Sequence, residues 1–212
     1  MTPFDFVEAL KTLTFENTFN PYSDHCPTCD HNNAPRHRYD VLLSILESAI
    51  DSDIDSLWIG RDLGYRGGRR TGLALTDEVH MATHANRWGV STERVTKGEI
   101  VAERTAAVTW DMLEQIDTCI FLWNVFPLHP HQPNQPFTNR SHNARERCIG
   151  EELLLALIHL LEPRRLVPIG NDAAMSARRL DVKNPIFQVR HPSYGGRDEF
   201  VKQVSDLYDL GH

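Results

Sequence analysis

The stretch LWIGRDLG at residues 57–64 decides the fold, because a short apolar run leads directly into a glycine and then into charged residues. A short apolar run bounded by such residues is typical of a buried β-strand. The same pattern recurs at residues 119–124, 166–170 and 186–190. We therefore predict a short, mostly apolar strand in each of these segments.

Helical patterns lie between the predicted strands, at residues 35–49, 143–161, 172–180 and 198–207. Strands that alternate with helices predict parallel pairing and a sheet covered on both faces. The expected fold is an α/β fold: a three-layer α/β/α sandwich around a central four-stranded, mainly parallel sheet. We find no internal repeat and no low-complexity segment, so we predict a single domain over residues 1–212.

The composition excludes several classes of protein. With 41% hydrophobic and 24% charged residues, the 212-residue chain is neither disordered nor a coiled coil. No apolar run reaches the roughly 18 residues of a membrane span, and the N-terminus lacks a signal-peptide pattern. We expect a cytoplasmic monomer that does not contact a membrane. The formal charge of −7 argues against coating nucleic acid by bulk attraction, but it allows a local basic groove.

Polar residues that suit catalysis follow three of the predicted strands. Asp62, Asn124 and His191 each stand at or just past a strand end. Because parallel strands end at one edge of the sheet, we expect these side chains to lie together there. An Asn can donate and accept on adjacent atoms, as reading a base edge requires, and a His can stabilise developing negative charge.

The segment at residues 60–72 is rich in glycine and arginine. Glycines permit close backbone approach to a ligand, and guanidinium groups bind phosphate through paired hydrogen bonds. The segment matches neither the dinucleotide fingerprint nor the phosphate-binding P-loop. It predicts a partner with phosphate groups, and the arginines that we expect to contact a DNA backbone include Arg66, Arg69 and Arg70.

Taken together, these motifs resemble those of the uracil-DNA glycosylase superfamily. The first superfamily motif resembles Gly60-Arg-Asp62-Leu-Gly64, and a later one resembles residues 71–75. The strand-end Asn corresponds to Asn124, and the final His-Pro-Ser motif is present at residues 191–193. The resemblance covers about residues 57–200, in the expected order.

The resemblance implies hydrolysis of the N-glycosidic bond of uracil, or of a related damaged base, in DNA after base flipping. Asp62 and His191 are the implied catalytic residues: Asp62 acts on the water and His191 on the departing base. The implied base-binding residues are Gly60, Gly64, Tyr65, Leu75 and Asn124. The implied DNA-binding residues are Arg66, Arg69, Arg70, Ser193, Tyr194 and Arg197.

The chain departs from the superfamily pattern at several positions. Leu63 stands where the first motif usually has a proline. Leu75 stands where many members have a phenylalanine that stacks on uracil. Stacking on the base would then come from another residue, such as Tyr65 or Phe126, or be weaker. One branch carries a tyrosine that excludes thymine at the position of Gly64, so base preference stays open.

The four cysteines are expected to be reduced thiols, and we expect no cofactor and no metal. Cys26 and Cys29 resemble the start of the cysteine set that holds an iron–sulfur cluster in some superfamily members, and Cys148 resembles the last ligand. At the position of the third cluster ligand, this chain has Leu128. Zinc at Cys26 and Cys29, with nearby histidines, is the alternative. The histidines of residues 129–131 are interpreted as an exposed turn.

Two other functions are compatible with these residues. One is a superfamily member that binds DNA or a nucleobase without efficient turnover, because of Leu63 and Leu75. The other is an enzyme that acts on a small nucleotide, since the same architecture serves many chemistries. The sequence leaves open the preferred base, the preference for single or double strands, and the oligomeric state.

Overall fold

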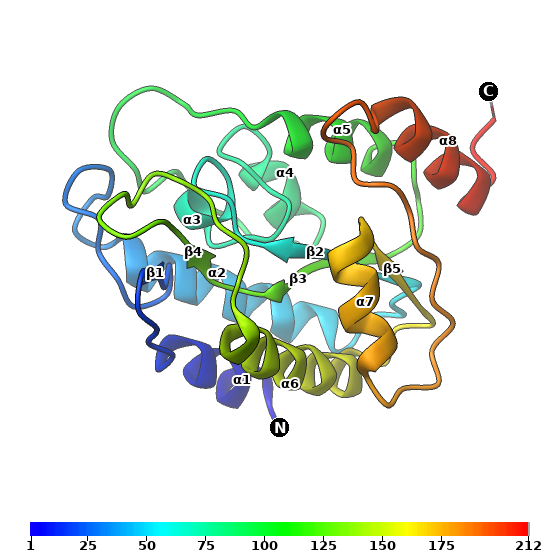
Figure 1. Ribbon diagram of the computed structural model, residues 1–212, viewed down its shortest axis with the longest axis horizontal. Helices are drawn as coiled ribbons and strands as arrows, with labels where there is room; N and C mark the ends of the chain where they lie inside the picture. Colours follow the sequence, from blue (N-terminus) through cyan, green and yellow to red (C-terminus); the bar gives the residue numbers. More distant parts are fainter. Residues whose placement is uncertain (212) are drawn as a thin grey trace.

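β2 (Ser56–Asp62) is the central strand of a parallel sheet. In the computed structural model, which describes residues 1–211, β3 (Ile120–Phe126) pairs with one side of β2 and β5 (Arg165–Pro168) pairs with the other (Figure 1). All three strands run in the same direction, so their carboxyl ends lie at the same edge of the sheet. A separate antiparallel pair is formed by β1 (Thr18–Phe19) and β4 (His129–Pro130).

The prediction of a fourth strand at residues 186–190 is wrong. This segment runs beside β5 and is joined to it by isolated parallel bridges. The N–H of Phe187 donates to the carbonyl of Leu166, and the N–H of Val189 donates to the carbonyl of Pro168. Between these two hydrogen bonds, the ladder would need an N–H of Pro168 to donate to the carbonyl of Phe187, but proline carries no N–H. The sheet therefore has three parallel strands in the order β3-β2-β5.

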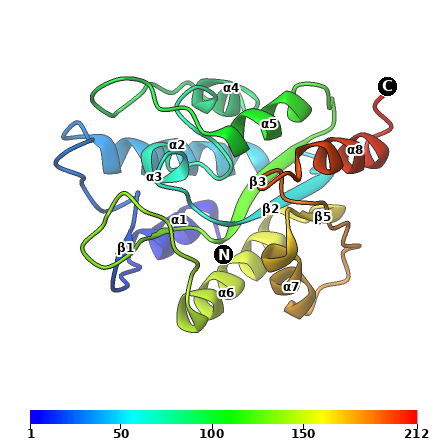
Figure 2. The same cartoon turned by 45° about the horizontal axis from the view of Figure 1, so that its top comes forward.

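Helices cover both faces of the sheet, as the strand–helix alternation predicts (Figure 2). Successive residues of a strand point to opposite faces, so Leu57 and Ile59 of β2 belong to one buried cluster and Trp58 belongs to the other. The first face is covered by α1 (Pro3–Lys11), α2 (Ala34–Ala49), α6 (Ala144–Leu161) and α7 (Asn171–Arg179). The second face is covered by α5 (Arg104–Leu113) and α8 (Arg197–Leu207).

The four predicted helices correspond to α2, α6, α7 and α8 to within a few residues. α6 begins where the sequence pattern predicts because Asn143 caps it. The Asn143 side chain accepts hydrogen bonds from the backbone N–H groups of Arg145 and Glu146, and the Glu146 carboxylate accepts one from the backbone N–H of Asn143. α1 and α5 were not predicted. The short helices α3 (Gly68–Thr71) and α4 (Met81–Asn86) were also missed, because they are too short to show helical periodicity.

Within residues 1–211, no helix combines the length and the apolarity that a bilayer crossing requires.

α6 packs directly on the backbone of β3. An ideal Cβ on Gly150 of α6 would overlap the carbonyl oxygen of Val125 and lie 3.2 Å from the Cα of Phe126. This close approach is possible because Gly150 has no side chain. It holds the start of α6, and the residues that precede it, against the carboxyl end of the sheet.

Replacing Gly150 with Ala is therefore expected to destabilise the protein although alanine favours helix. Removing a helical glycine gains roughly 1 kcal/mol at most, whereas overpacking a close contact costs about 1–3 kcal/mol. Denaturant titration should give a lower free energy of unfolding for Gly150→Ala, while the exposed Glu152→Ala on the same helix should stay near wild type. A Gly150→Ala protein more stable than wild type would contradict the close contact.

Candidate active site

A cavity of about 740 Å³ opens at the carboxyl edge of the sheet, beyond the ends of β2, β3 and β5. Its walls bring together residues that are far apart in the chain. The predicted site residues that line it are Gly60, Asp62, Gly64, Leu75, Asn124, His191, Ser193 and Tyr194. The edge of the sheet therefore gathers the strand-end residues that the sequence pattern singled out.

Asn124 of β3 lies beside Gly60 of β2 in the sheet register. It is 1% exposed, and an ideal Cβ on Gly60 would overlap its Oδ1 atom. Within residues 1–211 this oxygen has no hydrogen-bond partner. A buried acceptor without a partner costs about 1–3 kcal/mol, so Asn124 offers an unused acceptor at the cavity wall.

The carboxylate of Asp62 is held through both oxygens. Nδ1 of His142 lies 2.5 Å from Oδ1, and Nε of Arg61 donates to Oδ2 at 2.6 Å. Arg61 also donates to Asp172 of α7 at 2.9 Å, which ties the end of β2 to the start of that helix. Each carboxylate oxygen has a second lone pair. Asp62 is therefore fixed in place and can still accept a hydrogen bond from a water molecule in the cavity.

His191 is held as a neutral ring that presents its Nε2–H. The backbone N–H of Ser193 donates to Nδ1 at 3.2 Å, and the Ser193 hydroxyl lies 2.8 Å from the same nitrogen. Because a backbone N–H can only donate, Nδ1 is the unprotonated nitrogen and the ring proton is on Nε2. Burial lowers the pKa of His191, and the positive charges of Arg61 and Arg190 lower it further.

Gly170, after β5, brings the chain close to His191. Its φ of +89° is a conformation that L residues rarely adopt, and an ideal Cβ there would lie 3.1 Å from the Cβ of His191. The glycine therefore allows the histidine to sit against the end of β5.

Leu75 supplies an aliphatic wall where the superfamily pattern has an aromatic ring. Its backbone is in the left-handed region, at φ +54°, and its carbonyl accepts a hydrogen bond from Nε1 of Trp110 at 3.2 Å. The two alternative stacking residues do not reach the cavity wall. Tyr65 packs beside the guanidinium of Arg66, and Phe126 is fully buried.

Arg69 is buried, which does not support the prediction that it binds DNA. It is 5% exposed, and its guanidinium lies 3.7 Å from the centroid of the Phe19 ring and 3.1 Å from Nδ1 of His129. The interpretation of His129 as part of an exposed turn is wrong, because this residue is fully buried. Burial, followed by the charge of Arg69, lowers the pKa of His129 to about 3.

Arg70 is also engaged inside the protein. Its Nε lies 2.9 Å from Oε1 of the buried Glu78. A guanidinium paired with a buried carboxylate is not free to bind phosphate, so the structure does not support DNA contact by Arg70 either. Arg66 is exposed, as is Arg197 at the start of α8.

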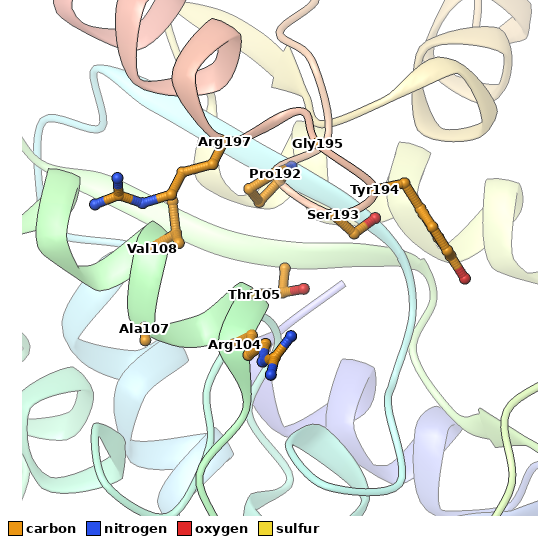
Figure 3. A pocket seen from close by; sticks show the side chains of 9 residues that line it. All are labelled: Arg104, Thr105, Ala107, Val108, Pro192, Ser193, Tyr194, Gly195 and Arg197. Carbon is orange, nitrogen blue, oxygen red and sulfur yellow. The ribbon is translucent and has the colours of Figure 1, made fainter.

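A second cavity, of about 660 Å³, adjoins the first and shares Thr105, Ser193 and Tyr194 with it (Figure 3). Arg104 and Arg197 lie on its rim. The ring of Tyr194 projects from the loop and is 98% exposed. The loop after His191 therefore presents a free aromatic ring at the edge of a cavity that two arginines also line.

The four cysteines are free thiols. Cys26 and Cys29 share a turn, Cys119 lies just before β3 and Cys148 is exposed on α6. Burial opposes ionisation of Cys26, but Arg69 and the backbone N–H groups of Cys29 and Thr28 together outweigh this and lower the pKa of the thiol. Among residues 1–211, no three His, Cys, Asp or Glu side chains are grouped as a metal site would require.

Sequence reasoning missed two residues of this site. His142, next to Asp62, stands in the loop just before the cap of α6, and Glu103, on the cavity wall, stands just before α5. Neither belongs to a motif at a strand end. The available signal was weak: each precedes a helix whose first turn faces the carboxyl edge of the sheet.

Comparison with known proteins identifies the class of fold. No family model and no curated protein matches the chain. Among solved structures, the crystal structure of wild-type SMUG2 from Pedobacter heparinus matches with a TM-score of 0.65 and 15% sequence identity, over 99% of this chain and 98% of that one. The chain therefore shares the fold of SMUG2, in agreement with the layered α/β fold that the sequence predicts.

The electrostatics of the cavity predict how His191 titrates. Because Arg61 disfavours the charged ring, Arg61→Gln should raise the pKa of His191, whereas Arg164→Gln, far from the cavity, should leave it unchanged. NMR of the ring nitrogens against pH measures both the pKa and the tautomer. A wild-type ring protonated on Nδ1 at neutral pH would contradict the assignment of Nε2 as the donor.

Proposed function

We propose that this protein is a DNA glycosylase of base-excision repair, which hydrolyses the N-glycosidic bond of uracil or of a related damaged base in DNA. One observation carries the proposal: Asp62, Asn124 and His191 line a single cavity at the carboxyl edge of the sheet. The fold shared with SMUG2 supports the same class of function.

Asn124 is suited to read the hydrogen-bonding edge of uracil. Its unpaired Oδ1 can accept from the ring N3–H, and its amide N–H can donate to the adjacent carbonyl oxygen of the base. A base with this complementary edge pairs a buried acceptor that otherwise stays unsatisfied. Gly60, Gly64 and Leu75 form further parts of the wall around the base.

His191 would stabilise the departing base. When the bond between the base nitrogen and the sugar C1′ breaks, its electron pair goes to the base, and negative charge builds on the carbonyl oxygens. The Nε2–H of His191 can donate to the oxygen that Asn124 does not contact. A fixed donor aimed at developing charge contributes strongly in a site with little water.

Asp62 would act on the sugar side. Its negative charge stabilises the cationic character that C1′ gains as the base leaves. It can also accept a hydrogen bond from the water that adds to C1′ and take up the proton of that water. His142 and Arg61 hold the carboxylate for both roles.

The base must leave the duplex to reach this cavity, and the exposed Tyr194 is suited to fill the gap that it leaves. Arg66, Ser193 and Arg197 are the proposed contacts to the DNA backbone. Arg69 and Arg70 are not among these contacts, because both are engaged inside the protein.

The catalytic assignment predicts that Asp62→Ala and His191→Ala each slow uracil release by about 100-fold or more, because each removes a group that acts on the transition state. The measurement is cleavage, after alkaline treatment, of single- and double-stranded oligonucleotides with one uracil. The exposed Asp181→Ala and His159→Ala are matched controls and should keep wild-type rates.

If wild-type protein at stoichiometric concentration releases no uracil, uracil excision is wrong. Binding assays with DNA and with a free nucleotide then distinguish a DNA-binding protein from an enzyme that acts on a small nucleotide. Affinity for DNA that falls steeply as salt rises indicates a DNA-binding protein, whereas salt-insensitive affinity for a free nucleotide indicates a small-molecule enzyme.

Tyr194 is expected to matter for duplex substrates alone. Tyr194→Ala should reduce uracil release from double-stranded DNA by about tenfold, because the flipped state loses an aromatic group that stacks in the gap, and should leave single-stranded DNA almost unaffected. Phe4→Ala, at an exposed aromatic residue on α1, is the control. Equal losses on both substrates would argue against insertion of the ring.

A further inference from the structure

Cys26 and Cys29 stand at the two ends of one backbone turn. The N–H of Cys29 donates to the carbonyl of Cys26 at 3.2 Å, and the N–H of Asp30 donates to the same carbonyl at 2.8 Å. The first and fourth residues of such a turn have Cα atoms less than about 7 Å apart, and a disulfide usually spans about 4.4–6.8 Å between Cα atoms. The turn therefore holds the two thiols at a separation that a disulfide can bridge.

The turn is fixed at both cysteines by contacts with other parts of the chain. The N–H of Cys26 donates to Oδ2 of the buried Asp30 at 2.9 Å. The carbonyl of Cys29 accepts a hydrogen bond from the N–H of Lys97 at 2.6 Å. The two thiols therefore belong to an ordered part of the fold.

Arg69 is a buried cation beside this turn, and within residues 1–211 no carboxylate forms an ion pair with it. Its hydrogen bond goes to Nδ1 of His129, a ring that stays neutral because its pKa is lowered to about 3. Asp30, whose charge also reaches Arg69, is already paired with another arginine. Burial lowers the pKa of Arg69, and the group that most opposes this effect is the Cys26 thiol. Because a buried charge is costly without a partner, Arg69 favours the thiolate of Cys26.

The two thiols are not equivalent. Burial acts against both thiolates, but at Cys26 the contacts described above outweigh it and lower the pKa, whereas at Cys29 burial and the neighbouring Cys26 raise the pKa. The thiolate is the form that reacts with peroxides. Cys26 is 5% exposed, which favours a small oxidant over a bulky one. Cys29 is less buried.

We infer that Cys26 and Cys29 form a site of reversible oxidation, at which hydrogen peroxide oxidises Cys26 and Cys29 converts the product into an intramolecular disulfide. The inference concerns a modification of this chain and does not rest on the proposed function. A thiolate that reacts with peroxide and a second thiol within reach of it are the two parts that such a site requires.

The reaction has two steps. The Cys26 sulfur attacks one oxygen of the peroxide, so that an S–O bond forms, the O–O bond breaks, and the leaving hydroxide takes up a proton and becomes water. The Cys29 sulfur then loses its proton and attacks the sulfur of the resulting sulfenic acid. The S–S bond forms, the S–O bond breaks, and the leaving hydroxide takes up that proton as a second water. Together the two thiols lose two electrons, which reduce the peroxide.

The site lies behind the glycine-rich loop of the cavity. Asp30, which holds the turn, pairs with the buried Arg38, and Nε of Arg38 donates to the carbonyl of Arg70 at 2.8 Å. Arg69 and Arg70 belong to α3, and Gly68 at the start of this helix lines the cavity. Oxidation of the thiolate removes the negative charge that faces Arg69. It therefore changes the charge next to a segment that forms part of the cavity wall.

The test treats the reduced protein with hydrogen peroxide, alkylates the remaining thiols with N-ethylmaleimide, and identifies the products by peptide mass spectrometry. Cys29→Ser removes the resolving thiol and Cys26→Ser removes the reacting one. Cys148→Ser, at an exposed thiol on α6, is the matched control. Dimedone, which labels sulfenic acids, is added to a parallel sample of each protein, and thermal unfolding checks that each variant is folded.

In the wild type we expect a disulfide between Cys26 and Cys29 that dithiothreitol reduces, with Cys119 and Cys148 still alkylated. Cys26 should be oxidised about tenfold or more faster than Cys148, because its thiolate is favoured although its thiol is less exposed. In Cys29→Ser, dimedone should label Cys26. In Cys26→Ser, no disulfide should form and Cys29 should stay unlabelled. Cys148→Ser should behave as the wild type does.

Faster oxidation of Cys148 than of Cys26 would show that exposure alone sets reactivity, and would overturn the inference. Dimedone labelling of Cys29 in Cys26→Ser at the rate seen for Cys26 would also overturn it. So would stoichiometric zinc or iron in the purified wild type that protects both thiols from alkylation. If a serine variant does not fold, the comparison of Cys26 with Cys148 in the wild type decides the inference by itself.

Discussion

The parallel register of β2 against β3 places Gly60 beside Asn124, and the candidate site depends on this pairing. Because Gly60 has no side chain, the carboxamide of Asn124 occupies the space above it. β2 then continues to Asp62, so the proposed base-reading group and the proposed acidic group stand on neighbouring strands. A shift of one residue would turn Asn124 to the other face of the sheet and dismantle the site.

Buried ion pairs hold the glycine-rich loop beside this pair of strands. Arg70 pairs with Glu78 and Arg38 pairs with Asp30, while Nε of Arg38 also donates to the carbonyl of Arg70 at 2.8 Å. Loss of one partner from such a pair leaves an uncompensated buried charge, which is strongly destabilising. Arginines that resemble a phosphate-binding cluster in the sequence are therefore largely structural, whereas Arg66 of the same loop stays exposed.

Most of the fold was predictable, because apolar runs that end in glycine and helices with an apolar stripe are local patterns. The prediction of a fourth strand was wrong because of a residue on the neighbouring strand. The apolar pattern of residues 186–190 suits a strand, but regular pairing needs backbone N–H donors along the neighbouring strand. Pro168 of β5 has no N–H. The apolar pattern of one segment does not show whether the strand beside it can donate the hydrogen bonds that pairing requires.

The sequence by itself determined the layered α/β architecture and the presence of Asp62, Asn124 and His191 at strand ends, since parallel strands bring their carboxyl ends to one edge. Tertiary structure alone decided that His142 holds Asp62, that Arg69 is buried, and that the carboxyl group of Glu103 faces the cavity. Burial and hydrogen bonding of a side chain depend on residues distant in the chain, and no local pattern records which residues those are.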